Sequence, residues 1–387
     1  MTNPDSRNVL YYVDRYLPPS QAFIRQQARA LQRYKPSFLT GQTLSSSESL
    51  AEFPVQDIRR SIPLRASELA LKVLRTPLPP LIESVRRADL VHAHFGKNGY
   101  VVHPLAAKAA RPLVTTFHGF DATYQGDPKG PGGFNSVRFF SRGRQEMTGW
   151  NSWQIAVSDF IQDKLLELGF DESRVFRHYI GVDTALFRPQ EKIRRPGRVV
   201  SIARFVEYKG HSFMIEALRR AVAAGADVDF VMVGQGPLRG EIEALARKVL
   251  PKVTIHDRLS QAEIRDLLSE AQIYLHGSVT LDNGHAEAMG IANLEAEALG
   301  TPVVAFRSGG VGEAVEDGAS GYLFAERDVE GMAGAVVRLL QDEALWSAFS
   351  HRATQLVPER FDIRRQSASL EAFYDDVIDR FGQGARK

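Results

Sequence analysis

The chain contains no cysteine among its 387 residues. This absence excludes disulfides, thiolate metal sites and cysteine nucleophiles, and it fits a reducing cytoplasm. No run of 18 or more apolar residues occurs, and Met1 to Val13 lacks the apolar stretch of a signal peptide. We therefore expect a cytoplasmic protein without a membrane-spanning helix.

Other absences narrow the range of functions. No basic segment is interleaved with aromatic residues, so we expect no nucleic-acid partner. No Asp-x-Asp pair stands at an expected strand end, and Asp282-Asn283 is the nearest approach, which predicts a site without a divalent metal. The segment at 233–240 has three glycines, but the third is one place late for a dinucleotide fingerprint and no acidic partner is evident. These absences disfavour a nicotinamide-dependent enzyme.

The length and the charge distribution indicate two different halves. A chain of this length is expected to form two domains of about 150 to 200 residues each. The formal net charge is +2. Residues 1–190 carry 24 basic and 17 acidic residues, whereas the remainder carries 24 and 29. The basic first half is open to two interpretations: a solvated charged face, or a surface that meets an anionic membrane or a lipid-diphosphate acceptor.

Short apolar strands alternate with helical segments along both halves. A linker rich in proline and charge, Arg188 to Gly197, separates two such series, and residues 41–65 are interpreted as a polar loop. Alternation of this kind predicts parallel α/β layers. We therefore predict two consecutive doubly wound, Rossmann-like domains with a cleft between them. The expected strands lie at 9–13, 90–94, 113–117, 155–158, 199–203, 229–234, 253–256, 273–276 and 303–306.

The segment between Asp282 and Phe306 carries the most specific chemical signal. Glu287 follows a turn, and Glu295 lies eight positions later on a short apolar helix that ends at Gly300. The N-terminus of this helix presents free backbone N–H groups, which suit a diphosphate. Two carboxylates beside an anion would repel it unless they bind hydroxyl groups. A sugar nucleotide is therefore the ligand that this segment predicts.

A second loop supplies the positive charge that a diphosphate requires. Arg204 and Lys209 follow the expected strand at 199–203, and Gly210 precedes the next helix. Two cations on one strand–helix loop can hold one pyrophosphate, with arginine as a fork and lysine as a point charge. Gly234 lies in a turn that we place near the nucleotide. The glycine-rich loop at 308–313 is equally consistent with close approach to a ligand and with a plain tight turn.

Histidines mark two strand ends in the first half. His118 follows a buried strand and precedes Gly119, where ligands collect in open α/β sheets. It is interpreted as a ligand contact, with a structural loop-capping role as the alternative. His92 and His94 flank Ala93 at a similar strand end. No carboxylate or cysteine is spaced to complete a metal site, so a local structural hydrogen bond is the favoured interpretation.

Together these residues resemble glycosyltransferase family 4, retaining enzymes of GT-B fold. The resemblance covers the chain from about Leu90 to Leu323, and residues 273–325 are most similar to exopolysaccharide and colanic-acid type members. The motifs, in chain order, are His118-Gly119-x-Asp121, Val157-Ser158, Gly181-Val182-Asp183, Arg204-x4-Lys209-Gly210 and Glu287-x7-Glu295. With this fold we place the domains at 1–190 and 191–365, and we expect the helix at about 366–387 to pack back onto the first domain.

The resemblance implies a role for each site residue. Arg204 and Lys209 would bind the donor diphosphate and stabilise the leaving group, and Glu295 would hold the ribose hydroxyls. Glu287 would contact the transferred sugar, and His118 would lie beside it. Backbone N–H groups near Gly290 and Ile291 would complete the phosphate site. In two places the chain departs from many relatives: it lacks the glycine-rich loop after the first strand, and Ala288 follows Glu287 where glycine is usual.

The sequence thus predicts a metal-independent, retaining glycosyltransferase that needs no cofactor. It would move a hexose from a nucleotide-diphosphate sugar, UDP first and GDP next, to a glycan or polyprenyl-diphosphate-linked acceptor. A peripheral contact with an anionic membrane, at the inner face of the cell membrane, would follow from the basic first half. Two alternatives remain: a GT-B epimerase or hydrolase that acts on the free nucleotide sugar, and a non-catalytic sugar-nucleotide-binding partner.

Overall fold

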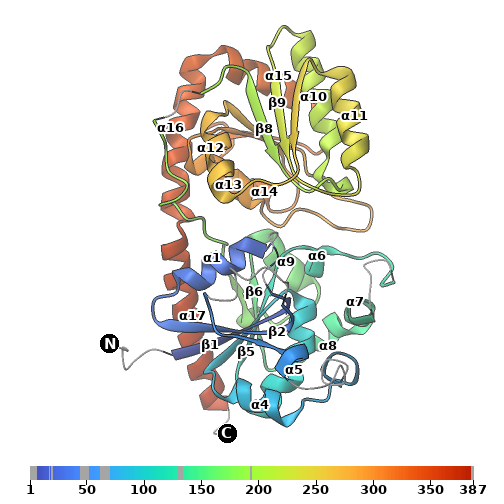
Figure 1. Ribbon diagram of the computed structural model, residues 1–387, viewed down its shortest axis with the longest axis vertical. Coiled ribbons are helices and arrows are strands. Elements are labelled where there is room, and N and C mark those ends of the chain that lie inside the picture. The colour runs from blue at the N-terminus through green and yellow to red at the C-terminus, as the bar shows by residue number, and fades with distance from the viewer. Residues whose placement is uncertain are drawn as a thin grey trace. The chain divides into compact units, whose positions relative to one another are not determined.

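The computed structural model describes residues 7–16, 18, 21–43, 52–61, 70–129, 134–191 and 194–384. The chain divides into two compact units (Figure 1). Unit 1 comprises Met1–Gly181 together with Ile363–Lys387, and unit 2 comprises Val182–Asp362. The predicted boundary after residue 190 lies beyond Gly181, where the structure divides the chain. The C-terminal helix returns to unit 1.

Unit 1 is built on a seven-stranded parallel sheet with the strand order β3-β2-β1-β4-β5-β6-β7. Its strands are β1 (Arg7–Arg15), β2 (Tyr34–Gln42), β3 (Val55–Asp57), β4 (Leu90–His94), β5 (Leu113–Phe117), β6 (Trp153–Ala156) and β7 (Val175–Arg177). The strands β4, β5 and β6 are buried along their whole length, as expected for a parallel sheet covered on both faces. Their carboxyl ends form the edge at which a ligand would collect.

The helices of unit 1 connect these strands. They are α1 (Ala22–Ala30), α2 (Ile58–Ser61), η3 (Ala70–Leu74), α4 (Pro79–Arg86), α5 (Gly96–Ala109), α6 (Phe120–Thr123), α7 (Phe134–Arg138), η4 (Phe139–Gly143), α8 (Arg144–Thr148), α9 (Asp159–Glu167), η5 (Glu172–Arg174) and α17 (Ile363–Gly384). The last helix packs beside α1, and both contribute side chains to the core under one face of the sheet (Figure 1). Tyr374 on α17 is fully buried there.

Two details of unit 1 differ from the sequence-based expectation. The polar segment 41–65 is not loop throughout, because β3 and α2 lie within it; residues 44–51 and 62–65 fall outside the described residues. The helix after β4 begins at Gly96 and not near Pro104. A Cβ atom at Gly99 would lie 2.3 Å from the Thr115 hydroxyl, so this glycine reflects close packing of α5 on the sheet and not a helix break.

Unit 2 repeats the plan with a six-stranded parallel sheet in the order β10-β9-β8-β11-β12-β13. Its strands are β8 (Arg198–Ile202), β9 (Asp229–Val233), β10 (Lys252–His256), β11 (Ile273–His276), β12 (Val303–Phe306) and β13 (Gly321–Phe324). Its helices are η6 (Glu207–Lys209), α10 (His211–Ala223), α11 (Arg239–Val249), α12 (Gln261–Glu270), α13 (Ile291–Ala298), α14 (Val311–Ala314), α15 (Val329–Gln341) and α16 (Glu343–Arg360).

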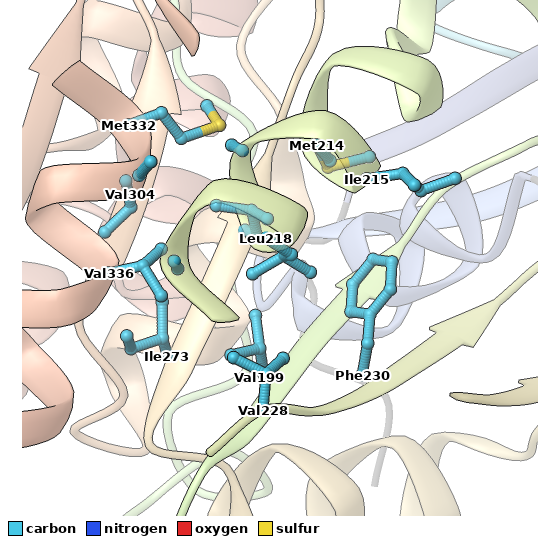
Figure 2. Close-up of a cluster of buried hydrophobic side chains, with 14 of the residues drawn as sticks. Val199, Met214, Ile215, Leu218, Val228, Phe230, Ile273, Val304, Met332 and Val336 are labelled. Atoms are coloured by element: carbon cyan, nitrogen blue, oxygen red, sulfur yellow. The ribbon is translucent and has the colours of Figure 1, made fainter. Parts of the chain in front are cut away.

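The main core of unit 2 lies between the sheet and helices α10 and α15 (Figure 2). Val199 and Phe230 project from the strands, Leu218 comes from α10, and Met332 and Val336 come from α15; all are at most 1% exposed. Burial of each such side chain stabilises the fold by about 1.5–3 kcal/mol. Apolar strands without alternation and helices with one apolar face are the pattern that predicted this arrangement.

The predicted fold class, α/β with two Rossmann-like parallel-sheet domains, is confirmed. Helix α16 was not predicted. Its buried residues Phe349, Ala353, Leu356 and Val357 recur at helical spacing and could have revealed it.

Candidate functional site

Lys209 and Glu287 form a buried ion pair in unit 2. Only 14% of the lysine side chain and 13% of the glutamate side chain are exposed. Burial opposes the charge on Glu287, but the neighbouring Lys209 ammonium and His276 outweigh it and lower the pKa of the carboxyl to about 2. Burial would likewise lower the pKa of Lys209, but the charge of Glu287 raises it. Both groups are therefore charged at neutral pH, and each neutralises the other.

The pairing of two neighbouring strands brings these residues together. Lys209 follows β8, Glu287 lies in the long connection after β11, and β8 and β11 are adjacent. The two connections touch through the backbone, since the amide of Val279 donates to the Tyr208 carbonyl at 2.8 Å. Gly210 has φ 59°, and a Cβ atom there would lie 1.9 Å from the Gly277 carbonyl oxygen. The glycine beside Lys209 is therefore required by this close approach.

The glycine-rich loop after β12 holds the backbone of Glu287. The amide of Gly310 donates to the Glu287 carbonyl at 3.0 Å. The hydroxyl of Ser278, two residues after β11, lies 3.4 Å from the Glu287 carboxylate. The loop at 308–313 therefore supports the Glu287 backbone. The carboxylate is thus positioned from two sides.

Glu295 stands in a different electrostatic environment from Glu287. It lies on α13, and it makes no ion pair or hydrogen bond with any residue that the structure describes. Burial raises the pKa of its carboxyl to about 7. Near neutral pH this group can therefore donate as well as accept a hydrogen bond, as a partner for ligand hydroxyls would require.

The N-terminus of α13 is shaped by Gly290, which has φ 81°. The N–H groups of Ile291 and Ala292 have no acceptor within the helix, whereas the N–H of Asn293 donates to the Gly290 carbonyl at 3.0 Å. A Cβ atom at position 290 would lie 2.7 Å from the Asn293 side-chain nitrogen and 3.1 Å from Cε1 of His276. Sequence reasoning missed these last two residues. His276 ends a buried strand in the same way as His118 follows one, and this signal could have found it.

Two predicted donor-site residues, Arg204 and Gly234, lie at neighbouring turns. Arg204 is exposed, and its side chain contacts no acidic group among the described residues. Gly234 packs against the backbone just before Arg204, because a Cβ atom at position 234 would lie 1.9 Å from the Ala203 carbonyl oxygen. The amide of Phe205 donates to the Gln235 carbonyl at 3.0 Å. The glycine therefore serves contact between two turns, one of which carries Arg204.

In unit 1, His118 lies where predicted, directly after β5. Its Nε2 is 3.1 Å from Nδ1 of His94, and its ring packs against the rings of Phe95 and Phe23, with centroids 4.6 and 5.0 Å away. Burial lowers the pKa of His118 to about 3, so the ring is neutral.

Asp121 holds the backbone around His118 in place through hydrogen bonds. Its carboxylate accepts hydrogen bonds from the amides of Gly96 at 2.6 Å, His118 at 3.0 Å and Gly119 at 3.1 Å. Burial raises the pKa of this carboxyl to about 6, although the backbone N–H groups oppose the shift. The carboxylate thereby occupies the N-terminus of α5, where it takes the place that an anionic ligand could fill.

His92 makes local hydrogen bonds, as the sequence analysis favoured. Its Nδ1 lies 2.5 Å from the Tyr374 hydroxyl and its Nε2 lies 2.6 Å from the Thr116 hydroxyl. Among the described residues, no group of three or more histidine, aspartate or glutamate side chains is placed to hold a metal ion. In the same part of the chain, no helix is long and apolar enough to cross a bilayer.

Two α/β units, each built on a parallel sheet, define a class that comparison with known proteins identifies. Residues 183–356 match the family model described as glycosyl transferases group 1, and residues 20–186 match the model for glycosyltransferase family 4. The chain belongs to this family and is a glycosyltransferase. The resemblance found in its motifs is confirmed.

Several curated relatives support this assignment. The chain is 28% identical over 276 residues to the amylovoran biosynthesis glycosyltransferase of Erwinia amylovora, a match that covers 69% of this chain and 66% of the relative. It is 27% identical over 299 residues to a putative colanic acid biosynthesis glycosyltransferase of Salmonella typhimurium, which covers 73% and 70%. It is 30% identical over 305 residues to a glycogen synthase of Mycobacterium tuberculosis, which covers 74% and 69%.

Among solved structures, HepE of Anabaena shares the fold over nearly the whole length. A crystal structure of that protein in complex with UDP and glucose matches with a TM-score of 0.76, and the match covers 96% of this chain and 100% of that one. The sequence identity is 18%. This similarity supports the GT-B fold.

Proposed function

We propose that this glycosyltransferase moves a hexose, with retention of configuration, from a nucleotide-diphosphate sugar to a glycan or polyprenyl-diphosphate-linked acceptor in polysaccharide assembly. UDP is the first candidate donor nucleotide and GDP the second. The names of the amylovoran and colanic acid relatives support the pathway class, and the UDP-glucose complex of HepE supports the donor class. The observation that carries the proposal is the buried Lys209–Glu287 pair beside the N-terminus of α13.

The charges of the site suggest how the leaving group is stabilised. In the proposed complex, the diphosphate attracts the Lys209 ammonium, and Arg204 and the N–H groups at Gly290 and Ile291 add further positive potential. Glu287 then accepts hydrogen bonds from hydroxyls of the transferred sugar. Fixed cations of this kind act where negative charge develops on the departing phosphate. We propose that they take the role a divalent metal would have.

The remaining roles follow the same proposal. Glu295 binds the ribose hydroxyls, and His118 lies beside the donor sugar. The bond between the anomeric carbon and the β-phosphate oxygen breaks, and the acceptor oxygen bonds to the same carbon on the same face. The acceptor proton passes to the departing phosphate oxygen. Neither a cofactor nor a protein nucleophile takes part in this scheme.

A donor screen followed by turnover assays tests the proposal. A nucleotide sugar at about 100 times its Kd should stabilise the protein by roughly 2.7 kcal/mol. We expect binding of a UDP-sugar, acceptor-dependent release of UDP, retention at the anomeric carbon, and no loss of rate with a chelator. Nucleotide or epimer release without acceptor would instead favour an epimerase or hydrolase. A donor that binds but never turns over would favour a non-catalytic partner.

We also propose a peripheral contact between unit 1 and an anionic membrane at the inner face of the cell membrane. Leu74 and Phe134 are 67% and 59% exposed, and their elements η3 and α7 are in contact. The nearby Arg142 side chain is 60% exposed and lies 3.3 Å from the carboxylate of Glu146, with which it forms a surface ion pair. Apolar anchors beside arginine suit an anionic interface. Arg33 is likewise ion-paired within unit 1, with Asp375.

Vesicle sedimentation tests this contact. The protein should bind vesicles that contain phosphatidylglycerol more strongly than phosphatidylcholine vesicles, and added salt should weaken that binding. The paired change Leu74→Ser and Phe134→Ser should reduce binding without changing turnover on a water-soluble acceptor. Equal binding to both vesicle types would contradict the proposal.

A further inference from the structure

Three histidine rings lie in a row at the carboxyl edge of the unit 1 sheet. His92 and His94 project from β4, and His118 follows the adjacent strand β5. The centroids of the first two rings are 4.4 Å apart, and those of the second and third are 5.3 Å apart. His94 occupies the middle of the row and is 1% exposed.

The contact between His94 and His118 couples the protonation of the two rings. Nδ1 of His94 lies 3.1 Å from Nε2 of His118. Burial and the neighbouring rings keep the pKa of His94 well below its ordinary value, and burial lowers that of His118 to about 3. Each ring is therefore neutral and carries one N–H. A hydrogen bond between the two facing nitrogens requires that one of them bears the proton and the other does not.

The two outer nitrogens decide which arrangement suits a bound ligand. Nε2 of His94 and Nδ1 of His118 are both buried, and neither has a hydrogen-bond partner among the described residues. If His118 donated to His94, then His94 would keep a buried N–H that no ligand at His118 could satisfy. If His94 donates, its outer nitrogen is a bare acceptor, and His118 presents Nδ1–H. A ligand oxygen can then satisfy that donor.

We propose that His94 is a positioning residue for His118: its Nδ1–H donates to Nε2 of His118 and holds that ring with its own proton on Nδ1. This inference rests on the proposed function, in which His118 contacts the donor sugar. In that role, Nδ1–H of His118 donates to a sugar oxygen. His94 itself does not touch the substrate.

The surroundings of His94 are built to keep its ring in place. Its neighbour in the stack, His92, is anchored at both nitrogens by Tyr374 and Thr116. The ring of Tyr11 meets His94 edge-on, with centroids 5.2 Å apart. A ring clamped in this way loses little freedom when it makes its hydrogen bond, which favours one geometry.

The backbone after His94 carries strain that serves the same end. Phe95 has φ 74° and ψ 134°, a conformation that a bulky residue rarely adopts. This conformation places its ring against His118, with centroids 4.6 Å apart. Strain of this kind persists only where the surrounding structure imposes it, and it gathers at functional sites. His118 is therefore held by a hydrogen bond from one residue and by ring packing from the next.

Three substitutions at one position separate positioning from simple packing. His94→Asn keeps a side-chain N–H at the place of Nδ1, so it can still donate to His118. His94→Gln moves the amide to the place of Nε2, where His118 does not lie. His94→Leu removes the donor altogether. The matched controls are His103→Asn and His103→Leu, because His103 is a partly buried histidine of unit 1 that stacks on Trp150 with centroids 3.7 Å apart.

The first readout is the tautomer of His118 with the donor from the screen bound, measured by ¹⁵N NMR with labelled histidine. We expect the proton on Nδ1 in the wild type and in His94→Asn, and a mixture of tautomers in His94→Gln and His94→Leu. A wild-type His118 with its proton on Nε2 would overturn the proposal. So would an unchanged tautomer in both the glutamine and leucine variants.

The second readout is turnover with the donor identified by the screen. His94→Gln and His94→Leu should lower kcat about 10- to 100-fold, the order of loss known for removal of the group that orients a metal-bound histidine. His94→Asn should stay within about threefold of wild type, and the His103 variants should keep the wild-type kcat. Wild-type kcat in a folded glutamine or leucine variant would refute positioning. Wild-type kcat in His118→Ala would instead refute the proposed role of His118. The NMR measurement would still test the hydrogen bond between His94 and His118.

Discussion

The two units bury the polar groups of their candidate sites by different means. Unit 2 pairs opposite charges, Lys209 with Glu287, whereas unit 1 keeps a row of histidines neutral through burial. A charged pair can exchange partners when an anionic ligand arrives. A neutral row offers directed hydrogen bonds without net charge. Under the proposed function, the cations of unit 2 would bind the diphosphate, and the neutral histidines of unit 1 would donate a directed hydrogen bond to the sugar.

The largest effect is expected from Lys209→Ala, which leaves Glu287 buried without its counter-charge. Removal of one partner of a buried pair costs about 3–5 kcal/mol, and transfer should fall about 10²- to 10³-fold through loss of the cation at the leaving group. Thermal unfolding and initial rates measure the two losses.

Two further variants control for that prediction. The double variant Lys209→Met with Glu287→Gln should regain most of the stability without regaining activity, since no buried charge is left unpaired. Lys164→Ala removes a surface pair with Glu167 and should cost at most about 1 kcal/mol. A loss at Lys209 no larger than that at Lys164 would mean that the buried pair has no special role.

A pair of glycines tests how tightly the helix terminus in unit 2 is packed. Gly290 and Gly318 have φ 81° and 76°, but only Gly290 has a neighbour within 4 Å of a Cβ atom. Gly318→Ala should therefore cost about 1–2 kcal/mol from backbone strain alone. Gly290→Ala should cost a further 1–2 kcal/mol, by the order of overpacking effects, and should weaken donor binding. Denaturant melts and donor titration check this, and equal costs at both positions would argue against a packed terminus.

The unpaired carboxyl of unit 2 should make stability depend on pH. Folding raises the pKa of Glu295 from 4.5 to about 7, so the stability of its neutral form is fully present below pH 4.5 and is lost as pH rises through about 7. Glu295→Gln stays neutral. It should therefore match the wild type near pH 4.5 and exceed it by about 1–3 kcal/mol at pH 8.

Thermal melts at both pH values measure this difference, and donor titration should show weaker binding despite the higher stability. If the variant and the wild type differed equally at pH 4.5 and pH 8, the inference that burial suppresses the charge on Glu295 would fail.

The smallest effect is expected in the neutral row of unit 1. Tyr374→Phe removes the hydroxyl 2.5 Å from Nδ1 of His92 and leaves that nitrogen without a partner, at a cost of about 1–2 kcal/mol. Because burial keeps the pKa of His92 well below its ordinary value, the cost should be the same at pH 6 and pH 8. If the loss of stability caused by Tyr374→Phe differed between pH 6 and pH 8, His92 would be charged in this range. The two units would then not differ in the way described.

Much of the fold was predictable because the signals were local. Apolar strands, helical spacing and the proline-rich linker predicted two parallel α/β domains, and the structure has them. The segment 41–65 was predicted as a loop, although it contains strand β3. Three residues at a sheet edge are too few to show the apolar pattern of a strand. Glu287, Lys209 and His118 were singled out from motifs; the structure places His118 directly after β5, and Lys209 and Glu287 in the connections that follow β8 and β11.

The sequence by itself determined the family, the element types and the residues on which chemistry depends, because these follow from residue type and short spacing. Only the tertiary structure decided which of those residues meet. Lys209 pairs with Glu287 across 78 positions, and His94 reaches His118 across 24. It also decided that Glu287 is charged while Glu295 resists ionisation, because a pKa depends on burial and on neighbours that strand order brings together.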